Sequence, residues 1–119
     1  MPIVSKIILL LHNSPVRRDT DQIIDIKASK KLLRRNIIRG VSPFDRGFLF
    51  AHAAYEVTAV YNGKLIDFEG HVTRLQRTLA GIDIPEAIDA QALESLHLDL
   101  LSRNKVTEGF VYLQVTGGA

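Results

Sequence analysis

Cysteine is absent from the 119-residue chain, and long apolar runs are absent as well. The lack of cysteine excludes disulfide frameworks, cysteine nucleophiles and thiolate metal sites. The longest apolar run, from Ile7 to Leu11, is far below the roughly 18 residues that a membrane span needs. It is also shorter than the apolar centre of a secretory signal, which has at least about 7 residues. We therefore expect a cytoplasmic protein that does not enter a membrane.

The size and charge of the chain fit one globular domain with a basic leader. Hydrophobic residues make up 46% and charged residues 24%, an ordinary globular composition. Residues 1–40 hold nine Lys/Arg and three Asp, whereas residues 41–119 hold six Lys/Arg and ten Asp/Glu. Such asymmetry can mark a nucleic-acid arm or a segment of different origin. Residues 1–43 contain no aromatic side chain that could stack on bases, which argues against nucleic acid.

The first 40 residues give two weak structural signals. Residues 1–12 form an apolar block that fits a buried strand or a helical turn, because periodicity cannot decide over so short a run. From Ala28 to Arg39 the apolar residues recur at helical spacing beside Lys30, Lys31, Arg34 and Arg35. This pattern predicts an amphipathic helix with a basic face, closed by Gly40.

The residues after Val41 give a clearer pattern. Asn62-Gly63 lies between two strand-like segments and predicts a β-hairpin. Helices are expected at about 69–79 and 89–103, and a strand at 110–116. The order hairpin, helix, helix, strand indicates an α+β fold. Since no segment follows the last strand that could pair with it, we expect an incomplete sheet.

The residues alone identify no catalytic or metal-binding group. None of the four histidines stands in a metal-ligand spacing, and neither a glycine-rich phosphate loop nor a serine elbow occurs. His71 and Arg74 share a helix face at i, i+3, an arrangement more typical of a solvated surface than of a site.

Several ordered motifs from Val41 onward resemble one family, the class IV (fold type IV) aminotransferases, which use pyridoxal 5′-phosphate. The motifs are SPFDRGFLFA at 42–51, YEV at 55–57, VYNG at 60–63, EGHVTRL at 69–75 and GFVYLQVT at 109–116. YEV and YLQVT are most similar to the D-amino-acid aminotransferase branch. The resemblance covers residues 41–119 and implies the small N-terminal domain of that family.

The resemblance implies roles for three residues. Arg74 matches the arginine that binds the cofactor phosphate, a role that suits the rigid donor fork of a guanidinium. Tyr55 matches a tyrosine of the substrate pocket, and Tyr112 lies on the strand beside that pocket. The substrates implied are an amino acid and a 2-oxo acid, and the family works as a homodimer.

The chain departs from the family pattern in four respects. His52 replaces the acid of A-D-[AG]-V-Y-E, and Gly117 replaces the arginine of V-T-R-G. Residues 1–40 do not resemble the family's first strands, which suggests a foreign or frameshifted leader. The family's Schiff-base lysine lies downstream of the last strand, and none of the lysines present occupies a matching position.

These departures lead to three alternative interpretations. The first is an N-terminal fragment of a D-amino-acid-type aminotransferase that is inactive alone, because cofactor chemistry requires the missing lysine. The second is a dimerisation or interaction module that reuses the small domain. The third is a degenerate reading frame without a selected function.

Overall fold

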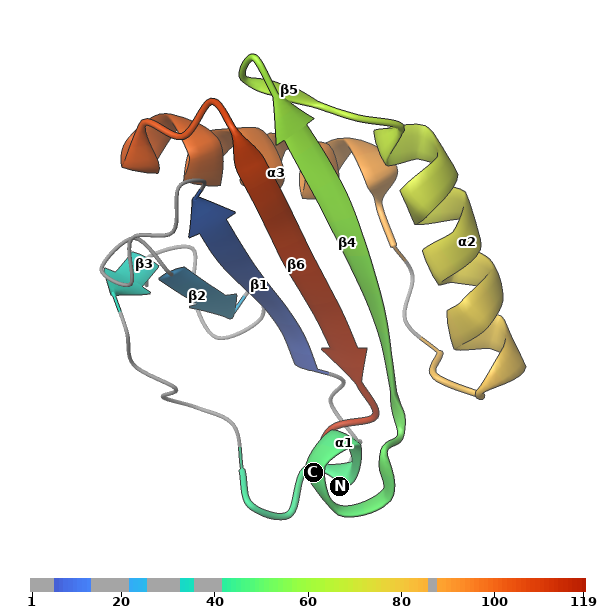
Figure 1. Ribbon diagram of the computed structural model, residues 1–119. Coiled ribbons are helices and arrows are strands. Elements are labelled where there is room, and N and C mark those ends of the chain that lie inside the picture. The colour runs from blue at the N-terminus through green and yellow to red at the C-terminus, as the bar shows by residue number, and fades with distance from the viewer. Residues whose placement is uncertain (1–5, 14–21, 26–32, 36–41, 86–87) are drawn as a thin grey trace.

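A computed structural model describes residues 6–13, 22–25, 33–35, 42–85 and 88–119. The elements are, in chain order, β1 (Lys6–Asn13), β2 (Gln22–Asp25), β3 (Leu33–Arg35), α1 (Arg46–Phe50), β4 (Ala53–Tyr61), β5 (Lys64–Leu65), α2 (Phe68–Gly81), α3 (Ala90–Asn104) and β6 (Gly109–Thr116). Strands and helices are combined in one unit, with α2 and α3 on one face of the sheet (Figure 1). The predicted α+β class is confirmed. None of the described helices is long and apolar enough to cross a membrane.

The six strands form one antiparallel sheet in the order β3-β2-β1-β6-β4-β5. Strand β6 lies at the centre and pairs along its whole length with β4 on one side and β1 on the other. The expectation that the last strand lacks a neighbour is therefore wrong. The second partner of β6 is β1, at the opposite end of the chain. The apolar pattern of residues 1–12 does not indicate which segment they pair with.

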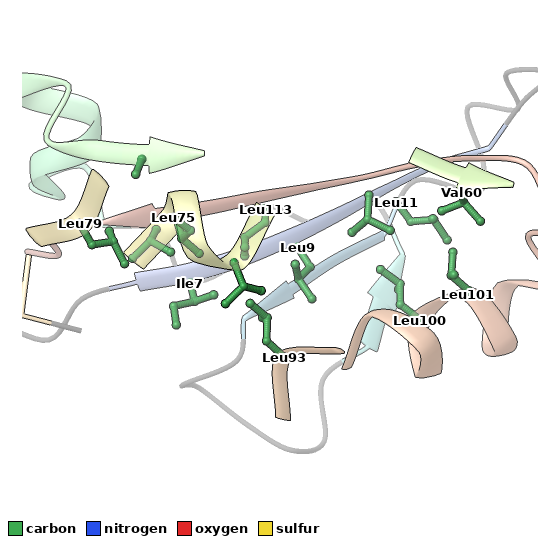
Figure 2. Close-up of a cluster of buried hydrophobic side chains, with 14 of the residues drawn as sticks. Ile7, Leu9, Leu11, Val60, Leu75, Leu79, Leu93, Leu100, Leu101 and Leu113 are labelled. Atoms are coloured by element: carbon green, nitrogen blue, oxygen red, sulfur yellow. The ribbon is translucent and has the colours of Figure 1, made fainter. Parts of the chain in front are cut away.

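The core lies between the sheet and the two long helices (Figure 2). Because side chains alternate along a strand, each central strand sends every second residue into this layer. β1 contributes Ile7, Leu9 and Leu11, all of which are buried. The helices supply the facing leucines, which are Leu75, Leu79, Leu93, Leu100 and Leu101. The first strand thus shares its core with the elements that follow Val41, whereas the boundary drawn after residue 40 remains a prediction.

The local predictions after Val41 are confirmed. Asn62 and Gly63 have φ values of 51° and 73°, as a two-residue hairpin turn with left-handed residues requires. The helix expected at 89–103 is α3, whose N-cap Asp89 accepts a hydrogen bond from the backbone N–H of Ala92 at 3.1 Å. The helix expected at 69–79 is α2, but Asp67 stands at its N-cap without a side-chain capping bond.

The helix predicted from Ala28 to Arg39 is wrong where the structure can test it. Leu33–Arg35 forms β3, which pairs with β2, and β2 in turn pairs with β1. In β3 the backbone N–H and C=O groups bond to a neighbouring strand instead of within a helix. The helical spacing of the apolar residues does not show that such a neighbour is present. Residues 26–32 and 36–41 lie outside the described part.

Candidate functional site

The alternation of side chains along β4 separates two functional candidates. Glu56 points toward the helices and is 5% exposed, whereas Tyr55 points to the open face of the sheet and is 64% exposed. A buried carboxylate is costly unless it is paired and hydrogen-bonded. The partners of Glu56 come from α2, which packs against β4.

Arg74 is the main partner of Glu56. The Nη2 group donates to Oε1 at 2.7 Å, and the Nε group donates to Oε2 at 2.9 Å. These two parallel bonds form the side-on fork that arginine makes with a carboxylate. The Arg74 side chain nevertheless remains 58% exposed, so its guanidinium bridges a buried anchor and the solvent.

His71, one helical turn before Arg74, completes the group. Its Nδ1 lies 2.6 Å from Oε1 of Glu56, and Nδ1 donates because the carboxylate can only accept. The hydrogen bond from Arg74 is the main reason that the pKa of Glu56 is lowered, with burial opposing it and His71 assisting. Glu56 also raises the pKa of Arg74, with smaller contributions from Asp67 and Tyr55. The charged form of this pair is therefore favoured in the folded protein.

An open concavity of about 500 Å³ lies over the first turns of α2. Its lining combines basic, acidic and small residues, namely Asp67, Glu69, Gly70, His71, Thr73, Arg74 and Arg77. A Cβ atom added at Gly70 would lie 2.5 Å from Oδ2 of Asp67, so the Asp67 carboxylate would have to shift. Donors from Arg74, Arg77 and Thr73 suit the oxygens of a phosphate.

Tyr55 and Tyr112 stand together on the other face of the sheet. Their rings stack with centroids 5.5 Å apart and planes 8° from parallel. The Tyr112 hydroxyl donates to Oε1 of Gln114 at 3.1 Å, and burial is the main cause that raises the pKa of Tyr112. Both tyrosines are predicted site residues, and the structure brings them into contact.

The structure adds Glu56, which is not among the site residues predicted from the sequence. His52 precedes β4 and its Nε2 donates to the carbonyl of Ile82 at 2.7 Å. A signal for Glu56 existed in the strand pattern, because an acid at an inward-facing position of β4 needs a cationic partner.

Comparison with known proteins identifies the relatives of this chain. No protein-family model matches it. D-alanine aminotransferase of Listeria innocua is 36% identical over 93 residues, which cover 78% of this chain and 32% of that protein. The enzymes of the same name from Listeria monocytogenes serotype 4b and Bacillus licheniformis are 39% and 38% identical over 74 residues, which cover 62% of this chain and 26% of each protein.

The matched lengths show how much of this chain and of its relatives the similarity covers. The 93 residues matched in the Listeria innocua protein exceed the 79 residues from Val41 to Ala119, so the similarity includes some residues before Val41. The chain spans only about a quarter to a third of the length of these relatives. Over most of its own length, this chain is related to the class IV aminotransferases of the D-alanine aminotransferase branch.

Proposed function

We propose that the chain provides the cofactor-phosphate site and part of the substrate pocket of a D-amino-acid aminotransferase. The observation that carries the proposal is Arg74, whose guanidinium is fixed by Glu56 yet exposed at an open concavity. Arginine in such a setting is suited to bind a phosphate dianion. The relatives named D-alanine aminotransferase make pyridoxal 5′-phosphate the corresponding cofactor.

The residues at the concavity fit the phosphate end of this cofactor. Arg74 and Arg77 offer guanidinium donors, and Thr73 offers a hydroxyl. When bound, the cofactor supplies the electron sink that amino-group transfer requires. The role of Arg74 is to hold and orient the phosphate.

Tyr55 and Tyr112 are proposed to contact the substrates, an amino acid and a 2-oxo acid. The stacked pair presents one broad aromatic surface on the open face of the sheet. Tyr55 is close enough to Arg74 to influence its pKa. Tyr55 therefore links the proposed substrate face of the sheet to the proposed phosphate site at Arg74.

The chain as given is proposed to be inactive in transamination. No lysine is among the described residues that line the concavity, and imine chemistry requires a lysine beside the cofactor. Lys64 lies on β5 next to the hairpin turn and is not among the residues that line the concavity.

A titration with pyridoxal 5′-phosphate, followed by visible absorbance and borohydride trapping with peptide mapping, tests these proposals. We expect saturable binding that requires the phosphate group, with no lysine labelled in preference to the others. The control ligand is pyridoxal, which lacks the phosphate. Arg74→Lys should weaken binding of the phosphate ester and leave the weak binding of pyridoxal unchanged.

Two results would contradict the proposal in different ways. Equal affinity for the ester and for pyridoxal would exclude a phosphate site at Arg74. Trapping at one lysine would overturn the expected inactivity and would identify that lysine as a catalytic candidate.

A second proposed function is a dimerisation module, as the family's homodimers suggest. The exposed side chains Tyr55, Val57 and Tyr61 form an apolar row along β4, on the face that α2 and α3 do not cover. Exposed apolar patches often mark interfaces. Sedimentation analysis of the wild type and of Tyr61→Glu tests it: a concentration-dependent dimer lost in the variant supports the module, and a monomer at every concentration rejects it.

A further inference from the structure

We infer that Glu56 is a positioning residue, which turns one fixed edge of the Arg74 guanidinium toward a bound phosphomonoester. This inference rests on the proposed phosphate site and adds the residue that prepares it. Glu56 has no place in the concavity lining, so it acts through Arg74 rather than on the ligand.

The hydrogen bonds divide the guanidinium into a used and a free edge. Nε and Nη2 both donate to the Glu56 carboxylate, which occupies the side-on edge. An arginine side chain has five N–H donors in a fixed plane. The remaining edge, formed by Nη1 and the second N–H of Nη2, is available to phosphate oxygens in the same plane.

The carboxylate is a firm anchor because both its backbone and its side chain are held. Glu56 lies in the middle of β4, opposite Leu113 of the central strand β6. His71 donates to the same Oε1 atom that receives Nη2 of Arg74, which fixes the plane of the carboxylate. Loss of Arg74 from this position would leave a buried negative charge with only one partner, an arrangement that is strongly unfavourable.

This anchoring has a cost and a benefit for anion binding. The negative charge of Glu56 offsets part of the attraction between Arg74 and an anion. Against that, an exposed arginine on a helix samples many rotamers, and its freedom is lost when it binds. A guanidinium already held in one orientation loses less. The positioning role predicts that removal of Glu56 weakens binding, whereas a purely electrostatic role predicts that it strengthens binding.

The test uses pyridoxine 5′-phosphate, which has no aldehyde and cannot react with lysine, and pyridoxine as the ligand without phosphate. Affinities are measured by calorimetry for the wild type, Glu56→Gln, Arg74→Lys and the double variant. The matched control is Glu69→Gln, which removes an exposed carboxylate from the same concavity. We expect Glu56→Gln to bind pyridoxine 5′-phosphate about tenfold more weakly, a change in affinity comparable to the loss of roughly one charge-assisted hydrogen bond. Glu69→Gln should bind it equally or more tightly.

The double variant separates positioning from a general loss of structure. If Glu56 acts through Arg74, its substitution in the Arg74→Lys background should cause no further loss of affinity. Equal or tighter binding by Glu56→Gln, with a clear loss in Arg74→Lys, would overturn the positioning role and retain the phosphate site. No loss in Arg74→Lys would overturn the phosphate site itself.

A measurement on the wild type covers the case in which Glu56→Gln does not fold. The Nε–H signal of Arg74 in a ¹H–¹⁵N spectrum reports the bond to Glu56 directly. Positioning predicts that this signal stays protected from solvent exchange when pyridoxine 5′-phosphate is added. Loss of the protection on binding would show that Arg74 leaves Glu56, and would overturn the inference.

Discussion

The ring of His52 lies directly against the backbone of Gly117. A Cβ atom on Gly117 would stand 2.2 Å from Nδ1 of His52, and the Gly117 N–H donates to the His52 carbonyl at 2.9 Å. These are the two positions at which the chain departs from the family's acid and arginine. The two departures therefore occupy one place in the fold, and the imidazole takes the space of a side chain at position 117.

Gly117→Ala is expected to destabilise the protein by about 1–3 kcal/mol, because the added methyl group overlaps the imidazole and forces one of them to move. Urea denaturation of the single variants and of His52→Ala/Gly117→Ala measures the coupling between the two sites. The methyl group should cost much less in the His52→Ala background. Equal costs in both backgrounds would mean that His52 does not limit the space at position 117.

Leu9→Ala is expected to lower the free energy of unfolding by about 2–5 kcal/mol, as for other fully buried leucines. Leu9 of β1 has no exposed surface in the core between the sheet and the helices. Leu98→Ala is the control, since Leu98 is 43% exposed on α3 and should change stability by less than about 0.5 kcal/mol. A Leu9→Ala variant as stable as the control would show that β1 does not contribute to the core.

Stability is expected to rise as the pH increases toward about 6.5 because of His97. This side chain is 1% exposed, and burial lowers its pKa from the ordinary value of 6.5. Below pH 6.5 the unfolded chain binds a proton that the folded protein resists, so acid favours unfolding by up to about 1.4 kcal/mol per pH unit.

The pH dependence can be assigned by substitution. Nδ1 of His97 donates to the Leu93 carbonyl at 2.7 Å, and the ring meets Phe68 edge-on. His97→Gln should flatten the stability profile just below pH 6.5 while lowering its overall level. The lowered pKa of Glu56 adds a separate loss of stability below its ordinary value of 4.5, and this loss should persist in the variant.

Thr116→Val is expected to cost about 1–3 kcal/mol, since it leaves a buried carboxylate oxygen without its donor. Asp45 is 2% exposed, and its Oδ2 accepts from the Thr116 hydroxyl at 2.9 Å while Oδ1 accepts from the Gly47 N–H. Thr107→Val, in an exposed loop, is the matched control. Thermal denaturation should show a clear decrease in melting temperature for Thr116→Val alone.

The sequence predicted well those elements whose conformation depends only on their own residues. The Asn62-Gly63 turn and the leucine spacing of α3 each specify their conformation through the residues involved. The partner of β6 was not predictable, because strand pairing depends on contacts between segments far apart in sequence. The helix expected around Leu33 was wrong for the same reason, since its strand forms only beside β2.

In the candidate site, too, the local features were predictable and the contacts between distant segments were not. Arg74, Tyr55 and Tyr112 were selected from motif resemblance, and the structure adds the stacking of the two tyrosines. The link between Glu56 and Arg74 joins a strand to a helix across 18 positions. No spacing rule predicts such a link, because it depends on how α2 packs against β4.

The central place of β6 has a consequence for synthesis on the ribosome. Its neighbours β1 and β4 are made earlier, yet Lys6 meets Thr116 only when nearly the whole described chain has been translated. Until then the apolar residues of β1 and β4 have no strand between them, a condition that favours aggregation. The sheet would therefore close only after its central strand has been made, because the contacts that complete it are the most distant in sequence.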